Sequence, residues 1–275
     1  MLLKKRLSSL SRLGYLMKIQ KIFQSQLRSS LETSPKNLTI SEEGATFILS
    51  AFSAKEKWRA NNFSKKEPET LRWLKDEISK DSIFWDIGAN IGLYSLYAAS
   101  IQPNAKVLAF EPESQNFASL CRNIFINKFK NIEPFNIAIN NAEPALVDLL
   151  ISEMEPGSAI HNINNQSPWA TEKPVFTQKT FAISIDSLVH SFKLPSPTIL
   201  KIDVDGIENQ ICEGGLKALN SSVKTLLVEI DELSPNEKNQ MLSIMESSGF
   251  RVFKTSDRSE LINGKMPKNY IWKKK

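Results

Sequence analysis

The order of hydrophobic and polar positions is regular from residue 83 onward. Short apolar runs alternate there with longer segments in which apolar residues recur every three or four positions. The runs predict strands at 83–87, 106–110, 132–139, 198–204 and 225–230, and the periodic segments predict helices at 93–100, 115–127, 207–219 and 237–247. Strands that alternate with helices indicate right-handed crossovers. The expected fold class is therefore α/β, with a doubly wound and mostly parallel sheet.

Two parts of this region depart from the alternation. The apolar runs 250–254 and 270–272 predict a terminal hairpin that closes the sheet. Between 145 and 185 the alternation of apolar runs and periodic segments stops, because Pro, Asn, Ser and Gly dominate from 156 to 174. We expect an insertion at about 152–179, flanked by strand-like segments at 145–151 and 180–185. A long loop in a compact domain is typical of a binding loop or lid.

The first 80 residues have a different pattern. Apolar residues recur at steps of three and four among basic residues, and these are Leu3, Leu7, Leu10, Leu13, Leu16 and Met17. They predict an amphipathic helix with a cationic face, which suits an anionic membrane surface or packing against the catalytic body or a partner subunit. The segment 34–80 is expected to be a helical lead-in. The predicted organisation is a helical N-terminal extension at 1–80 and a catalytic domain at 81–275.

The formal net charge of +5 is concentrated in the N-terminal arm. Residues 1–31 hold seven of the 35 basic residues and no acidic one, so the rest of the chain has 28 basic against 30 acidic residues. A basic arm on a slightly acidic body is poor evidence for nucleic-acid binding. We expect no nucleic-acid partner, and the composition carries no signal for an oligomeric state.

Several features predict the cytoplasm as the location. No apolar stretch approaches the roughly 18 residues of a membrane span, and Ser8, Ser9, Ser11 and Arg12 interrupt the early leucines before a signal peptide could form. Cys121 and Cys212 are far apart and predict free thiols in a reducing compartment. Residues 1–30 would allow peripheral contact with the cytoplasmic face of a membrane.

The most informative motif is a glycine turn after the first expected strand, with the sequence FWDIGANIG at 84–92. Gly88 and Gly92 let the backbone approach a ligand closely, and the start of the next helix presents N–H groups. In an open parallel sheet this turn lies at the carboxyl ends of the strands, where ligands bind. We expect Asp86, Gly88, Asn90 and Gly92 to contact a cofactor.

Glu111 lies 23 positions after Gly88 and closes the second expected strand. A carboxylate at this place can accept hydrogen bonds from both hydroxyl groups of a ribose. A nicotinamide-dependent oxidoreductase uses such an acid too. Its turn normally has the motif G-x-G-x-x-G, which binds the pyrophosphate of the cofactor, whereas this chain has Asn90 at the position of the middle glycine. The shorter turn suits a phosphate-free nucleoside whose methionine end offers an ammonium to Asp86. Methyl transfer is therefore favoured, and NAD-dependent hydride transfer is the alternative.

Four sequence blocks together resemble the FkbM-type family of class I S-adenosylmethionine-dependent methyltransferases. The blocks are 86–92, 109–112 with Asn116 and Asn123, 185–188, and 201–208 with Gly214 and Gly215. Many class I methyltransferases share the first block, whereas the order of all four is more specific. The resemblance spans about 83–253 and implies a Rossmann-like fold, S-adenosyl-L-methionine as methyl donor, and a hydroxyl acceptor on a sugar, glycolipid or secondary metabolite. Ala138, at the end of the third expected strand, would then border the adenine.

The block at 201–208 carries the candidate catalytic residues. Asp203 and Asp205 alternate with Ile202 and Val204, so both carboxylates are expected to leave a strand on one face. Converging acids raise one another's pKa, which makes one of them a candidate general base for a hydroxyl. In a second interpretation they hold a divalent cation with Glu208. In a third, Asp205 only caps the following helix.

Two further side chains and one further function complete the hypotheses. His161, in the insertion, is a candidate base because an imidazole titrates near neutral pH. Glu229, at the end of a strand, is a candidate for the acceptor pocket. A non-catalytic module that binds a membrane or partner through its basic N-terminal helix is the second alternative to methyl transfer.

Overall fold

The structure is a computed structural model of the chain, and it describes residues 35–163, 173–257 and 264–275. Residues 37–275 form one compact unit, which the following paragraphs describe, and residues 1–36 form a separate one. The amphipathic helix expected within residues 1–30 lies outside the described residues.

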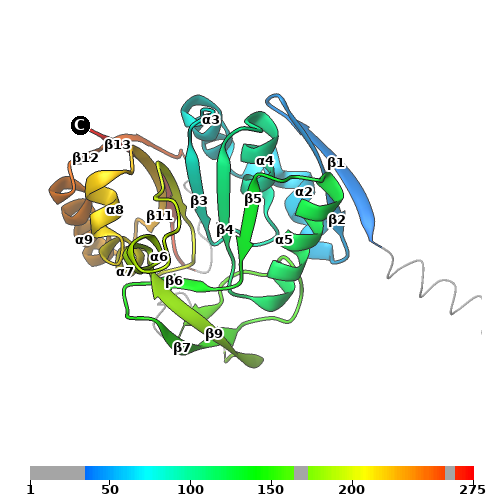
Figure 1. Ribbon diagram of the computed structural model, residues 1–275. Helices are drawn as coiled ribbons and strands as arrows, with labels where there is room; N and C mark the ends of the chain where they lie inside the picture. Colours follow the sequence, from blue (N-terminus) through cyan, green and yellow to red (C-terminus); the bar gives the residue numbers. More distant parts are fainter. Residues whose placement is uncertain (1–34, 164–172, 258–263) are drawn as a thin grey trace, which may run out of the picture. The chain divides into compact units, whose positions relative to one another are not determined.

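A mostly parallel sheet occupies the centre of this unit (Figure 1). Its seven described strands follow the order β12-β13-β11-β10-β3-β4-β5. They are β3 (Ile83–Ile87), β4 (Lys106–Phe110), β5 (Ile132–Phe135), β10 (Ile199–Ile202), β11 (Thr225–Asp231), β12 (Phe250–Thr255) and β13 (Pro267–Lys274). The strands from β5 to β11 pair in parallel, and β13 is antiparallel to both of its neighbours. The expected doubly wound α/β fold with a terminal hairpin is confirmed.

Alternate side chains of the central strands enter two separate cores. Phe84 of β3 lies in one core, while Trp85 and Ile87 lie in the other. The core of Phe84 is completed by α2 (Ala54–Lys66), α3 (Pro68–Glu77), α4 (Leu93–Ile101) and α5 (Ser114–Asn127). The core of Trp85 is completed by α6 (Ile185–His190), α7 (Glu208–Glu213), α8 (Leu216–Ser221) and α9 (Pro235–Ser247). Both faces of the sheet are thus covered, as a parallel sheet requires.

The helical expectation for 34–80 is wrong over its first part. Residues 36–51 form a hairpin of β1 (Lys36–Glu42) and β2 (Ala45–Ala51), followed by the helices α2 and α3. The turn residues Glu43 and Gly44 both have positive φ, 50° and 94°, as a two-residue type I′ turn requires. The apolar piece taken for helix is a strand whose alternate residues are buried.

Side-chain amides of α5 attach the hairpin to the catalytic body. The amide oxygens of Asn123 and Asn127 accept the backbone N–H groups of Ser50 and Ile48 at 2.9 and 2.7 Å. Without these bonds, the backbone N–H groups on this edge of β2 would be buried without a hydrogen-bond acceptor. Residues of the hairpin and of α2 and α3 therefore share a core with the sheet, although they precede residue 81.

A second, four-stranded sheet contains the expected insertion. It has the order β6-β9-β7-β8, with β6 (Ala138–Asn140), β7 (Ala145–Ile151), β8 (Asn162–Ile163) and β9 (Phe176–Ser184). The single strand expected at 132–139 is divided into β5 and β6, which belong to different sheets. The flanking strand at 145–151 is confirmed, and β9 begins earlier than expected. In Figure 1, β6, β7 and β9 lie together beneath the central sheet.

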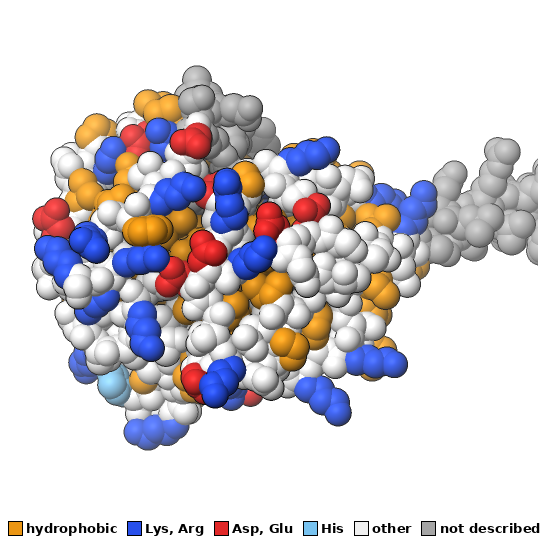
Figure 2. Space-filling view, turned by 90° about the horizontal axis from the view of Figure 1, so that it is seen from above, with side chains coloured by type: hydrophobic (Ala, Val, Ile, Leu, Met, Phe, Trp, Pro, Cys, Tyr) orange, Lys and Arg blue, Asp and Glu red, His pale blue; other side chains and the backbone are white. Residues whose placement is uncertain are grey.

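Three further observations concern the surface charge, the cysteines and the length of the helices. On the face shown in Figure 2, Lys and Arg side chains are spread between acidic and hydrophobic ones. Cys121 and Cys212 are free thiols, as expected. Among the described residues, no helix combines the length and the apolar character that crossing a membrane requires.

Candidate active site

The register of the sheet places the loops after β3, β4 and β10 side by side. Ile87 of β3 pairs with Phe110 of β4 on one side and with Ile202 of β10 on the other. The residues that follow these three strands are Gly88, Glu111 and Asp203, so they meet at the carboxyl edge of the sheet. The strand order reverses between β3 and β10, which is where open α/β sheets bind ligands.

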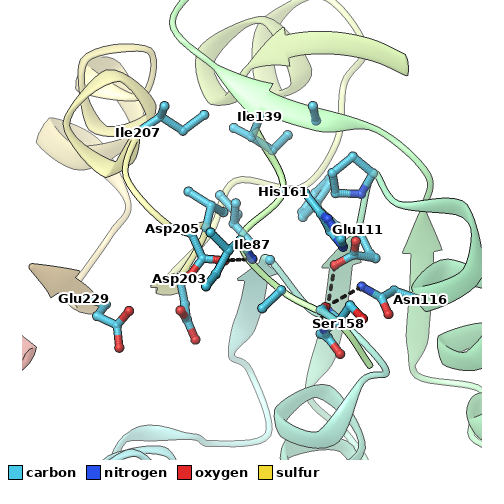
Figure 3. A pocket seen from close by; sticks show the side chains of 18 of the residues that line it. Ile87, Glu111, Asn116, Ile139, Ser158, His161, Asp203, Asp205, Ile207 and Glu229 are labelled. Carbon is cyan, nitrogen blue, oxygen red and sulfur yellow. Dashed lines mark hydrogen bonds between the residues drawn. The ribbon is translucent and has the colours of Figure 1, made fainter. Parts of the chain in front are cut away.

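A cavity of about 290 Å³ lies at this edge (Figure 3). Its walls come from the ends of β3, β4, β10 and β11, from the second sheet, from α2 and from the loop before β8. The expected site residues that line it are Gly88, Asn90, Glu111, Ala138, His161, Asp203, Asp205 and Glu229. In Figure 3, Glu229 and Asp203 lie on one side, and Glu111, Asn116 and Ser158 lie on the opposite side.

Gly88 is required because two backbone segments touch. Its φ is +80°, and a Cβ atom at this position would lie 1.9 Å from the carbonyl oxygen of Asp203. Gly92 has a different role, since its Cβ would meet Leu120 Cδ1 of α5 at 2.5 Å, and it does not line the cavity. Gly88 thus allows the turn to contact the backbone that follows β10, and Gly92 allows α5 to pack against the start of α4.

The N–H groups of the turn are already used within the chain. Gly88 and Ala89 donate to the carbonyl oxygen of Phe110 at 3.0 Å each, and Gly92 donates to Ala89. Asn90 donates to Glu111 Oε2 at 2.8 Å, and Ile91 donates to the side chain of Asn90. The N–H groups of residues 88–92 therefore stabilise the turn itself, and the expectation that the start of the next helix, α4, presents N–H groups to a ligand stays a prediction.

Glu111 forms the end of the cavity beside β4. Its side chain is 5% exposed and accepts N–H bonds from Asn90 and Glu113 at 2.8 and 2.9 Å, one on each oxygen. Each carboxylate oxygen retains a second lone pair for a ligand hydroxyl. Burial raises the pKa of Glu111 to about 7. The carboxylate is fixed in position and remains able to accept two more hydrogen bonds.

Three side chains hold the described part of the insertion over the cavity. Asn116 accepts the N–H of Gly157 at 2.7 Å, and both Asn116 and Asn90 donate to the carbonyl oxygen of Ser158. Asp205 accepts the N–H of Ile160 at 2.7 Å. The loop was expected to bind a ligand. Its fixation by these side chains was not expected, because their partners lie more than 40 residues away in the sequence.

Asp86 is placed differently from the expectation. It is 0% exposed and does not line the cavity; its Oδ2 accepts a hydrogen bond from Ser95 Oγ at 2.6 Å. Lys201 Nζ lies 3.6 Å from Asp86 Oδ1 and 3.0 Å from Asp203 Oδ2. The position opposite Asp86 that was expected for a ligand ammonium is thus taken by Lys201.

Lys201 stays charged although it is buried. Burial alone would lower its pKa, but the carboxylates of Asp203 and Asp86, followed by Glu67, raise the pKa above its ordinary value. The ammonium therefore orients Asp203 at the rim of the cavity. The sequence reading assigned no role to Lys201, since a lysine within a strand does not by itself indicate a buried ion pair.

Asp203 and Asp205 reach the cavity by a route other than the expected one. Because β10 ends at Ile202, neither side chain leaves the strand, and Asp205 has a φ of +64° in the loop that follows. The alternation argument is wrong, yet both residues line the cavity. Capping by Asp205 is also wrong, because α7 has no side-chain cap and Asp205 binds Ile160 instead.

The candidate metal ligands do not form a metal cluster in the described part of the chain. Glu208 accepts the N–H groups of Gly206 and Val204 at 3.0 and 3.3 Å, so it stabilises the loop. It does not line the cavity with Asp203 and Asp205. This arrangement gives no support to a divalent cation.

His161 and Glu229 occupy different sides of the cavity. His161 lies near Glu111 in Figure 3, its Nδ1 is 3.3 Å from Ser152 Oγ, and its buried Nε2 has no hydrogen-bond partner among the described residues. Burial lowers its pKa, which favours the neutral imidazole. Glu229 of β11 lies near Asp203, and burial followed by the Asp203 charge raises its pKa well above the ordinary value. The shift favours the neutral form of the Glu229 carboxyl group.

Residues 86–252 match the methyltransferase FkbM domain family. This match covers more than half of the chain, so the chain belongs to this family, and the protein is a methyltransferase of the S-adenosylmethionine-dependent class. The resemblance read from the four sequence blocks is confirmed.

Similar proteins include curated relatives and a solved structure. The chain is 28% identical to the hexuronic acid methyltransferase AglP of Haloferax volcanii, over 79% of this chain and 83% of the relative. It is 24% identical to Methyltransferase 1 of Beauveria bassiana, over 62% and 73%. The structure of TYW2 of M. jannaschii in complex with AdoMet matches 86% of each chain at 12% identity, with a TM-score of 0.43.

The Lys201→Met variant tests the buried ion cluster. Removing the ammonium leaves Asp86 charged and buried, so the free energy of unfolding in urea should fall by about 3–5 kcal/mol. The Asp86→Asn/Lys201→Met double variant should recover part of this loss. Lys106→Met, which breaks an exposed pair with Glu133, should cost less than about 1 kcal/mol. A Lys201→Met protein as stable as the Lys106→Met control would refute the role assigned to Lys201.

Proposed function

We propose that the protein transfers a methyl group from S-adenosyl-L-methionine to a hydroxyl oxygen of a sugar-containing acceptor. The observation that carries this proposal is one cavity with two chemically different ends. A hydroxyl-accepting carboxylate, Glu111, lies at one end, and the pair of Asp203 and Glu229 lies at the other. Both ends are needed if a nucleoside and an acceptor are to meet in one place.

The residues present fit the proposed donor. Glu111 would hold the ribose hydroxyls, and the apolar side chains of Ala138, Ile139 and Phe110 would border the adenine. The unpartnered Nε2 of His161 would face a polar atom of the nucleoside. When bound, S-adenosylmethionine supplies an electrophilic methyl group carried by a sulfonium. The carboxylate of Asp203 provides the negative charge that favours this cation.

Asp203 is the proposed general base. Its carboxylate borders the cavity and is held at 3.0 Å by the ammonium of Lys201, so it can accept the proton of an acceptor hydroxyl in a fixed geometry. Glu229, whose pKa is raised by burial and by Asp203, would donate a hydrogen bond to a second acceptor oxygen. Alignment and deprotonation would then supply most of the catalysis.

Two observations favour a sugar acceptor and methyl transfer to oxygen. A relative that covers most of this chain is named a hexuronic acid methyltransferase. The acceptor side of the cavity also contains carboxyl groups that can bind several hydroxyls. The hydride-transfer alternative is set aside, because the chain belongs to a methyltransferase family.

The Glu111→Gln variant tests the donor site. An amide cannot accept both ribose hydroxyls, so the Kd for S-adenosylhomocysteine, measured by isothermal titration calorimetry, should rise about 10- to 100-fold. Because the pKa of Glu111 is about 7 and hydroxyl donors favour the charged form, wild-type affinity should fall as the pH drops from 8 to 6. The variant should lack this dependence. The exposed Glu133→Gln control should behave as wild type, and a pH-independent wild type would remove Glu111 from the ribose site.

The Asp203→Asn variant tests the catalytic base. With a labelled methyl donor and a pool of glycosides, kcat should fall by about 100-fold or more, because proton transfer is lost. Affinity for S-adenosylhomocysteine should change by less than about threefold, since Asp203 is not assigned to the ribose. If the variant keeps wild-type turnover, Asp203 is not the base, and Glu229→Gln becomes the decisive variant.

A further inference from the structure

Helix α2 forms a wall of the cavity, although it lies outside the part of the chain that matches the family. Trp58, Arg59 and Lys66 of this helix all border the cavity. They share it with Asp203 and Glu229, which the proposed function places on the acceptor side. A role in acceptor recognition therefore requires no movement of the helix.

Hydrogen bonds to the insertion loop fix the first half of α2. Ser53, the residue that caps the helix, donates from its hydroxyl to the carbonyl oxygen of Pro156 at 2.6 Å. The N–H of Ala54 donates to Glu155 Oε1 at 3.1 Å, and Arg59 Nε donates to the carbonyl oxygen of Gly157 at 2.6 Å. Trp58 and Arg59 are thus held in place by contacts outside the cavity, as a preorganised binding site requires.

Arg59 presents an unused hydrogen-bonding fork. Its Nε is occupied by Gly157, but within the described part of the chain its two terminal nitrogens donate no hydrogen bond. A guanidinium with free terminal groups matches the planar, bidentate geometry of a carboxylate and also binds phosphate. The cation at the cavity wall is therefore suited to an anionic ligand group.

Trp58 adds an apolar surface beside this cation. It is 54% exposed although it borders the cavity. A single exposed aromatic side chain is common on protein surfaces and would mean little alone. Next to Arg59 at the mouth of a cavity, however, its indole offers a flat face for the C–H surface of a sugar ring.

We infer that Trp58 and Arg59 form the acceptor subsite and that this subsite takes a sugar bearing a carboxylate, with the ring on Trp58 and the carboxylate on Arg59. The inference rests on the proposed function and deepens it by naming the acceptor class. A hexuronic acid, from which the Haloferax volcanii relative takes its name, is a sugar of this class. A sugar phosphate would offer related anionic chemistry, and the experiment separates the two.

The acidic residues of the cavity do not prevent this assignment. Burial, followed by the charge of Asp203, raises the pKa of Glu229, which favours its neutral form and reduces its repulsion of an anion. Lys201 Nζ lies 3.0 Å from Asp203 Oδ2 and offsets part of its charge, and the guanidinium of Arg59 supplies positive charge at the cavity wall. An anionic group can therefore bind where Arg59 lies, while the carboxyl groups bind ring hydroxyls.

Calorimetric titration of the full-length protein, saturated with S-adenosylhomocysteine, tests the subsite. The ligands are methyl glucuronide, methyl glucoside and glucose 6-phosphate, of which the first two differ only in the carboxylate. The proteins are wild type, Arg59→Gln, Trp58→Ala and Lys65→Gln. Glutamine can still donate to Gly157, and Lys65 lies on the same helix but does not line the cavity.

The glucuronide should bind wild type about tenfold or more tightly than the glucoside, as expected for a charge-assisted bidentate contact. Arg59→Gln should abolish this preference and leave the glucoside and S-adenosylhomocysteine affinities unchanged, whereas collapse of the loop would weaken all ligands. Trp58→Ala should weaken both glycosides, and Lys65→Gln should match wild type. Equal binding of the two glycosides, binding of neither, or a preference for the phosphate would overturn the inference. Failure to bind S-adenosylhomocysteine at all would instead refute the proposed function.

Discussion

The buried ammonium of Lys201 is the constraint on which the rest of the site depends. It lies between Asp86 of β3 and Asp203 after β10, the two strands at which the sheet order reverses. A buried charge must be paired, so this lysine fixes the relative position of both strand ends. Gly88 then packs directly against the backbone of Asp203. The turn that holds Glu111 through Asn90 and the acidic end of the cavity are therefore joined by neighbouring contacts.

The outer walls of the cavity come from parts of the chain that carry no recognisable motif. Helix α2 and the loop before β8 are joined to each other through Ser53 and Arg59, and the loop is joined to the sheet through Asn90, Asn116 and Asp205. The sheet thus holds walls that come from outside the recognised motifs. This division explains how one fold supports methyl transfer to many acceptors while selectivity is determined by a few side chains.

The sequence was sufficient for the fold and for the part of the cavity wall at the strand ends, because strand and helix periodicities are local signals. Glu111 was found for the same reason, since it directly follows a strand, whereas Asn90 was found through the glycine turn and Ala138 through the family resemblance. Most of the errors concern long-range contacts or loop backbone. The hairpin at 36–51 was signalled by Glu43-Gly44 between alternating residues, and this signal was missed. Occupation of the Asp86 site by Lys201, the loop conformation of Asp205, and the role of α2 depend on partners remote in sequence.

The central claim is that this cavity holds the nucleoside of the methyl donor with its ribose on Glu111. A crystal structure of the protein with bound S-adenosylhomocysteine tests it most directly. The account predicts both ribose hydroxyls within hydrogen-bond distance of the Glu111 carboxylate, the adenine against Ala138, and the sulfur on the side of Asp203. A ligand bound elsewhere, or a ribose that makes no contact with Glu111, would contradict the account.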